Sequence, residues 1–244
     1  MIDILLPAFI AGMLVLASHI PLGRQVLERG IIFIDLAVAQ AAATGLLAVR
    51  HFAHVESNWL LQLVAIATAL GFALLLHQLE KLGHRVQEAL IGATFVVLAS
   101  ASVLMLASDP HGGEHLSASL AGQILWVDNP QLLALAASAI AALAAMALFR
   151  HPLLAFYLPF AIAITASVQA VGVYLVFASL IFPALAAWQG QRPLLIAGAV
   201  GIAGYLSGLA ASLWLDWPSG PAIVTTLAVA AILATVTRVI AARE

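Results

Sequence analysis

Long apolar runs, one after another and almost without charge, limit most strongly what this chain can fold into. Only 8% of its 244 residues are Asp, Glu, Lys or Arg, whereas 64% are hydrophobic, and the mean hydropathy is +1.11. Soluble domains contain about 25% charged residues. A single water-soluble globule is therefore excluded, and we expect the chain to lie in a lipid membrane.

Polar or Gly/Pro breaks divide the sequence into nine candidate membrane spans. A crossing takes about 20 apolar residues, and helices are expected because lipid cannot hydrogen-bond to an exposed backbone. We predict an all-α polytopic membrane helix bundle of about eight to nine transmembrane helices, in one domain over residues 1–244. The predicted spans are 4–22, 31–49, 59–76, 90–107, 132–149, 153–170, 171–188, 194–215 and 222–240.

Two features of this division carry further expectations. The sequence leaves open whether residues 153–188 form one long bent helix or two short ones. Recurring small residues in the last spans, including Gly198 and Gly208, indicate close helix packing.

Basic residues give the expected orientation, because short loops rich in Lys and Arg stay on the cytoplasmic side. Placing Arg24 and Arg29 inside puts eight of the nine basic residues on that side and leaves only Arg50 outside. We therefore predict the N-terminus outside and the C-terminus inside.

Charge and cysteine content exclude several function classes. The net charge of -2 offers no basic surface for nucleic acid. The absence of cysteine excludes thiolate metal sites and cysteine nucleophiles.

The most specific local feature is the hydrophilic loop Asp109-Pro-His-Gly-Gly-Glu-His115 between the fourth and fifth predicted spans. Its imidazoles and carboxylates suit zinc or manganese. The alternative is a solvated loop whose proline and glycines make turns. The loop also spells H-x-x-E-H, a zinc-hydrolase pattern. That chemistry needs the pattern on a helix, which the proline and glycines oppose.

A carboxylate lies inside the second predicted span. Asp35 there costs about 2.5–3.5 kcal/mol on insertion scales, and such groups normally face a bundle interior or a water-filled path. We interpret it as functional; the alternative is local hydrogen bonding. Gln40 lies about 140° around the helix from Asp35, so a shared site needs ligands from other helices. We expect His19 to be a satisfied interfacial histidine. The candidate metal ligands are Asp35, Gln40, His111, Glu114 and His115.

Several segments resemble conserved stretches of one known family of membrane proteins. Residues 170–187 resemble the family's V-G-x-L-L-V-x-x-L-L-I-x-P-A-x-x-A signature. Ser207-Gly208 and residues 216–221 resemble its S-G-L-x-x-S-x-x-x-D-x-P-x-G-P stretch. The other similar segments are 33–45, 87–92 and the 111–115 loop followed by 124–126. Through these segments the chain resembles the membrane permease of bacterial zinc and manganese ABC transporters.

The resemblance implies that the chain is one subunit of a multi-subunit transporter in the bacterial cytoplasmic (inner) membrane. Two copies of the permease would form a central path, a cytosolic ABC ATPase would power it, and an extracytoplasmic metal-binding protein would deliver the ion. The chain has no G-x-x-x-x-G-K-[ST] loop, so ATP would be used only by the partner. We expect no enzyme activity and no covalently bound cofactor, with Zn²⁺ (or Mn²⁺) as the transported ion. The alternatives are an intramembrane metallohydrolase using the 111–115 loop and an uncoupled structural or regulatory relative.

Two departures from the family pattern bear on this expectation. The family's second helix carries an Asp and a His four residues apart, whereas the aligned positions here are Leu36 and Gln40. The family also has a cytoplasmic loop with a short helix that engages the ATPase, whereas this chain offers only residues 150–152. Coupling would then run through the 79–89 loop.

Overall fold

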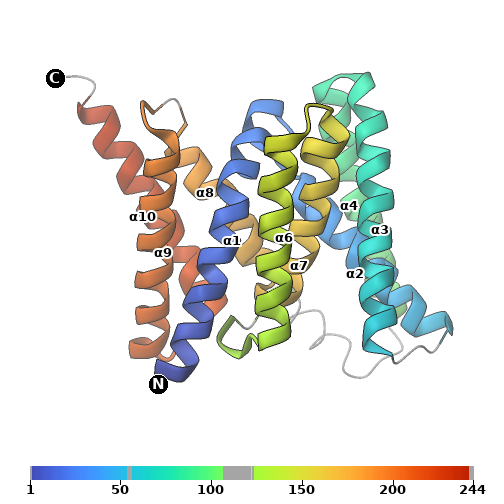
Figure 1. Ribbon diagram of the computed structural model, residues 1–244, viewed down its shortest axis with the longest axis horizontal. Helices are drawn as coiled ribbons and strands as arrows, with labels where there is room; N and C mark the ends of the chain where they lie inside the picture. Colours follow the sequence, from blue (N-terminus) through green and yellow to red (C-terminus); the bar gives the residue numbers. More distant parts are fainter. Residues whose placement is uncertain (1, 54–56, 107–121, 123, 189, 242–244) are drawn as a thin grey trace.

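The described part of the chain is a bundle of helices (Figure 1). The computed structural model describes residues 2–53, 57–106, 122, 124–188 and 190–241. Eight helices within these residues are long and apolar enough to cross a membrane. The α-helices are α1 (Ile2–Arg29), α2 (Ile34–Ala53), α3 (Asn58–Leu79), α4 (His84–Leu106), α6 (Asn129–Leu148), α7 (Leu158–Val171), α8 (Val173–Ala186), α9 (Pro193–Leu215) and α10 (Ser219–Ala241). The prediction of a polytopic helical bundle is confirmed.

Three short helical turns complete the described structure. They are the 3₁₀ turns η1 (Glu80–Leu82) and η2 (Ile124–Trp126) and the π-helical turn η3 (Leu153–Tyr157). Because η3 leads directly into α7, the two together form the span Leu153–Val171.

Several helices extend beyond the predicted spans into their polar flanks. α1 continues through Pro21 to Arg29 instead of ending at residue 22, and α4 begins at His84 instead of residue 90. α6 begins at Asn129 because Asp128 and Gln131 form a capping box, with a proline in the first turn. Apolar runs mark the hydrocarbon crossing, whereas hydrogen bonds and caps decide where a helix ends.

The stretch from residue 153 to residue 188 is two helices. α7 and α8 are separated at Gly172, whose φ of 83° lies in a region that side chains disfavour. The 14 residues of α8 reach only about 21 Å, less than the roughly 30 Å of a bilayer core. α8 packs against α1, α9 and α10. Its surroundings are therefore protein on several sides, where a break in the backbone is tolerated.

Large apolar side chains cover much of the outer surface, as Val96, Leu104, Leu133, Ile140, Leu148 and Ile232 illustrate. A helix in lipid gains nothing by hiding such side chains, since hydrocarbon is as apolar as leucine. Close packing therefore depends on small residues and on interhelical hydrogen bonds.

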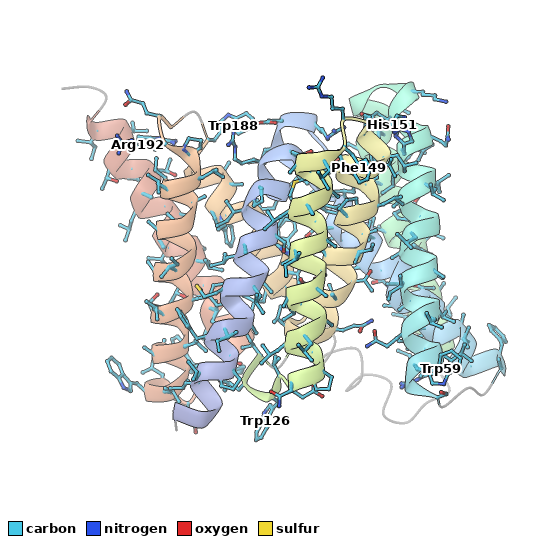
Figure 2. All side chains as sticks on the ribbon, viewed as in Figure 1. Trp59, Trp126, Phe149, His151, Trp188 and Arg192 are labelled. Atoms are coloured by element: carbon cyan, nitrogen blue, oxygen red, sulfur yellow. The ribbon has the colours of Figure 1, made fainter. Side chains whose placement is uncertain are left out.

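Basic side chains gather at one end of the bundle. The two termini lie at opposite ends (Figure 1). His151 and Arg192 share the end where the C-terminus lies, and Trp59 and Trp126 lie at the other (Figure 2). We call the first of these the basic end. The C-terminal parts of α1 and α10 and the turns after α3, after α6 and before α9 lie there (Figure 1), and they carry the basic residues Arg24, Arg29, Lys81, Arg150, Arg192 and Arg238.

Glycines allow α9 to approach its neighbours. A side chain at Gly201 would meet Leu16, one at Gly204 would meet Leu227, and one at Gly208 would meet the backbone of Ile223. Gly198 has nothing within 4 Å of the position a Cβ would take. The packing interpretation therefore holds for Gly208 and not for Gly198.

The two positions on α9 give a matched test of packing. We expect Gly208→Ala to lower the free energy of unfolding by about 1–3 kcal/mol, the usual cost of overpacking. Gly198→Ala should leave it unchanged or raise it by about 0.5–1 kcal/mol, because alanine favours a helix interior. Unfolding in mixed detergent micelles measures both, and equal effects of the two variants would contradict this account of the α9–α10 contact.

Candidate functional site

The site begins where α1 ends, at the basic end. The N–H of Gly30 donates to the carbonyl of Leu27 (3.2 Å), and that of Ile31 donates to Val26 (3.3 Å). These two bonds form a Schellman motif, which requires a left-handed residue such as Gly30, with φ 68°. Ile31 and Val26 are both fully buried and supply the apolar contact that accompanies the motif. The chain therefore turns sharply into α2.

This turn places Asp35 inside the protein. Asp35 lies in the first turn of α2 and is only 2% exposed. Its Oδ1 is buried and has no hydrogen-bond partner. A carboxylate in such surroundings is costly unless something compensates its charge. The structure therefore places the side chain of Asp35 away from lipid, as predicted. Metal binding by Asp35 stays a prediction.

A second carboxylate approaches the same turn from α4. Oε1 of Glu88 accepts a hydrogen bond from the backbone N–H of Phe33 (3.3 Å). Its Oε2 is buried without a partner. Sequence reasoning did not single out Glu88 because the predicted span began at residue 90. A search of the polar segment just before the predicted span could have found it.

Gln40 belongs to a different polar group. Its Nε2 donates to Oγ of Ser102 (2.9 Å) and to Oγ1 of Thr44 (3.3 Å). Thr44 in turn lies 2.9 Å from Ser102 and donates to the carbonyl of Leu98. These bonds join α2 to α4, as expected of interhelical hydrogen bonds in lipid. The side-chain amide of Gln40 thus donates hydrogen bonds to Thr44 and to Ser102 of α4. Its role as a metal ligand stays a prediction.

The outer-loop candidates His111, Glu114 and His115 lie outside the described residues, so their predicted role stays a prediction. Among the residues that the structure does describe, no group of three or more His, Asp or Glu side chains could hold a metal ion.

His19 differs from its expected interfacial position. It is fully buried, because α1 continues well beyond it toward the basic end. Nδ1 lies 3.0 Å from Oγ of Ser18, and Nε2 has no hydrogen-bond partner. The expectation of a satisfied interfacial histidine was therefore wrong.

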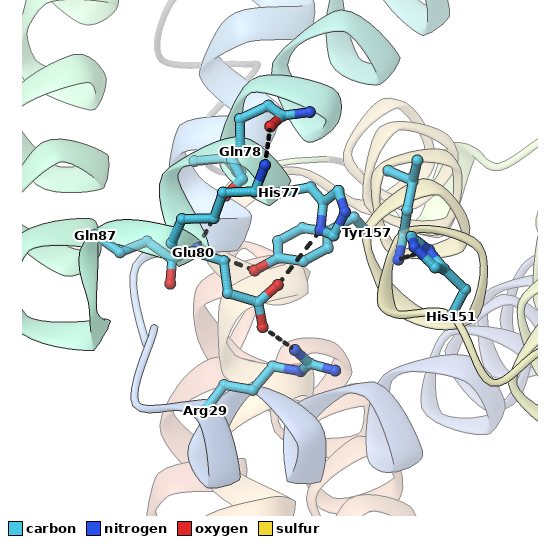
Figure 3. A network of polar contacts seen from close by, with 10 residues as sticks. Arg29, His77, Gln78, Glu80, Gln87, His151 and Tyr157 are labelled. Carbon is cyan, nitrogen blue, oxygen red and sulfur yellow. Dashed lines mark hydrogen bonds and ion pairs between the residues drawn. The ribbon is translucent and has the colours of Figure 1, made fainter.

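A network of polar contacts ties four elements together at the basic end (Figure 3). Nη1 of Arg29, at the end of α1, lies 2.9 Å from Oε1 of Glu80 in η1. Nδ1 of His77, on α3, lies 3.3 Å from Oε2 of the same carboxylate, although not in hydrogen-bond geometry. The guanidinium also lies 4.6 Å from the ring centre of Phe156 in η3, a cation–π distance.

Gln87 extends these connections to α4. Its Nε2 donates to the hydroxyl of Tyr157 and to the carbonyl of Leu76, both at 3.0 Å. The ring of Tyr157 lies 5.4 Å from that of His77, and His77 lies 5.4 Å from His151. The 150–152 turn and the 79–89 segment therefore share one network, which no sequence spacing indicated.

The sequence profile of the ABC 3 transport family matches residues 1–160 and 154–238 of the chain. The two matches overlap beside the short 150–152 turn. The fold is similar to "PsaBC from Streptococcus pneumoniae in complex with Fab", with a TM-score of 0.72 and 18% sequence identity, over 95% of this chain and 90% of that one. No curated relative matches the chain.

Burial predicts which ion pair at the basic end contributes to stability. Arg29 and Glu80 are 23% and 26% exposed, whereas Arg24 and Glu28 are 36% and 54% exposed. In a double-mutant cycle with Arg29→Met and Glu80→Gln, we expect a coupling of about 1 kcal/mol. The Arg24→Met and Glu28→Gln cycle should give at most about 0.5 kcal/mol because water screens that pair. Unfolding free energies of the unaltered protein, the four single variants and the two double variants measure both couplings, and a smaller coupling at Arg29–Glu80 would contradict the assignment.

Proposed function

The chain belongs to the ABC 3 transport family, and on that premise we propose that it is the membrane-spanning permease subunit of an ABC transporter that imports divalent metal ions. Of the two ions considered, zinc is favoured over manganese because the 111–115 loop offers imidazoles. The family assignment does not favour a metallohydrolase. One observation carries the proposal: a protein of a transport family holds the buried carboxylate Asp35 inside a membrane helix, without a partner for Oδ1.

Charge distribution supports the orientation. The chain is an integral membrane protein with many apolar spans. The positive-inside rule assigns the basic end to the cytoplasm, so we infer that the N-terminus is outside and the C-terminus inside, in the bacterial inner membrane. This orientation predicts that the 111–115 loop is on the outer side. Its histidines would receive the ion from an extracytoplasmic metal-binding protein.

We propose that two copies of the chain form the path and that a cytosolic ATPase drives it. Only residues 149–152 connect α6 to η3, so the ATPase-engaging helix expected there has no room. η1, between α3 and α4, is the alternative contact. Glu80 of η1 pairs with Arg29 at the end of α1. A displacement of η1 by the ATPase would therefore be transmitted through this ion pair to the turn that precedes Asp35.

An uncoupled relative of the permease remains a second candidate function, because the 150–152 turn is so short. The two candidates differ in one property: the coupled transporter hydrolyses ATP faster in the presence of metal, whereas the uncoupled relative does not.

Asp35 gives the test of transport. We expect Asp35→Asn to reduce uptake of radiolabelled zinc and manganese by metal-limited cells to the level of cells lacking the protein, because the neutral amide no longer attracts a cation. Glu28→Gln, which also removes one negative charge at the basic end, should transport normally. Wild-type uptake by the Asp35→Asn variant, at the same abundance in the membrane, would show that the ion path does not depend on Asp35.

The exposed side chain of Lys81, on η1, gives the test of coupling. With the chain and its ATPase reconstituted in lipid, Lys81→Glu should abolish metal-stimulated ATP hydrolysis, because it reverses the charge of the proposed contact. Arg192→Glu makes the same reversal elsewhere at the basic end and should retain stimulation. If both variants keep it, coupling does not pass through η1; if the unaltered complex shows none, the chain is an uncoupled relative.

A further inference from the structure

Asp35 and Glu88 reach the same turn from different helices. Glu88, on α4, binds the N–H of Phe33, and Phe33 precedes Asp35 by two residues. Two residues of chain span at most about 7 Å. The packing of α2 against α4 therefore brings Glu88 to the turn that carries Asp35.

Both carboxyl groups have an oxygen that the protein leaves unpartnered. Oδ1 of Asp35 and Oε2 of Glu88 are buried without a hydrogen-bond partner. Buried polar atoms in proteins are nearly always paired, and one that the protein leaves unpaired is a candidate ligand for an ion or a water molecule. The nearest turn of α1 offers Arg29, but its guanidinium binds Glu80. Among the described side chains, no ion pair includes Asp35 or Glu88.

The N-terminus of α2 compensates only part of the negative charge that Asp35 and Glu88 carry when ionised. A helix N-terminus acts as roughly half a positive charge, whereas two ionised carboxylates carry two negative ones. A divalent cation would neutralise both carboxylates. A shared proton is the other possible compensation and makes the opposite prediction for metal binding.

We propose that Asp35 and Glu88 together form a divalent-cation site at the start of α2. Carboxylate oxygens are ligands for Mn²⁺ and also for Zn²⁺, so the site suits either of the two ions considered. Asp35 is buried, whereas Glu88 is half-buried and Phe33 is 48% exposed, so the site leads from the interior toward the basic end. If the proposed transport function is right, this is the last protein site that the ion meets before release. Two protein carboxylates are few ligands, and the weak binding that results suits a release site.

Mn²⁺ binding to the purified full-length chain in lipid nanodiscs tests the site without any ATPase. The background carries His111→Ala and His115→Ala, so that the outer loop does not contribute. Free Mn²⁺ is measured by electron paramagnetic resonance. We expect Asp35→Asn and Glu88→Gln each to weaken binding by at least about tenfold, the lower end of the effect of losing a supporting group of a metal ligand. Glu28→Gln should bind as the background protein does.

A second measurement separates lost binding from lost folding. Mn²⁺ should raise the unfolding temperature of the background protein and of Glu28→Gln, but not of Asp35→Asn or Glu88→Gln, each of which should unfold cooperatively without metal. Glu88→Asp keeps the charge and should retain part of the Mn²⁺ effect. Unchanged Mn²⁺ affinity in either Asp35→Asn or Glu88→Gln would overturn the paired site, as would absence of binding in the background protein, the result expected of a shared proton. Binding without transport by the complete complex would contradict the proposed function and leave this site supported.

Discussion

Every backbone amide in hydrocarbon must find its hydrogen-bond partner within the protein, and the described structure depends on this constraint. Helices meet it within themselves. The backbone departs from the helix at Gly30 and Gly172, and at both points neighbouring structure compensates. The Schellman bonds satisfy the end of α1, and α8 packs against α1, α9 and α10. The turn at Gly30 is thus possible because its own hydrogen bonds satisfy the backbone, and the break at Gly172 because other helices surround α8.

The same constraint gives unusual weight to the few polar side chains inside the bundle. Some of them join helices, as Gln40 does through Ser102. Others, such as Asp35 and Glu88, leave a buried oxygen unpartnered. Polar groups that join helices consume their hydrogen bonds within the protein, whereas groups that bind a substrate must keep some available. This distinction separates Gln40 from Asp35, although both lie on α2.

Side-chain contacts at the basic end connect helices that are distant in the sequence. Arg29 links α1 to η1 through Glu80, and Gln87 links α4 to Tyr157 beside η3. Charged and aromatic groups that lie partly away from water interact more strongly than those on an open surface. Elements that are distant in the chain therefore share contacts near the start of α2, where a mechanical input from a partner would have to arrive.

The sequence by itself determined that the chain spans a membrane with many helices, because apolar run length and charge depletion are local properties. It also marked Asp35, since a charge within an apolar run is visible without a structure. It could not determine that Glu88 meets the same turn, that Gln40 turns to α4, or that His19 is buried. Helix ends also escaped it, because they follow from caps and hydrogen bonds rather than hydropathy. Only tertiary structure decided these points, because the pairing of helices sets which polar groups meet, and no residue carries that information alone.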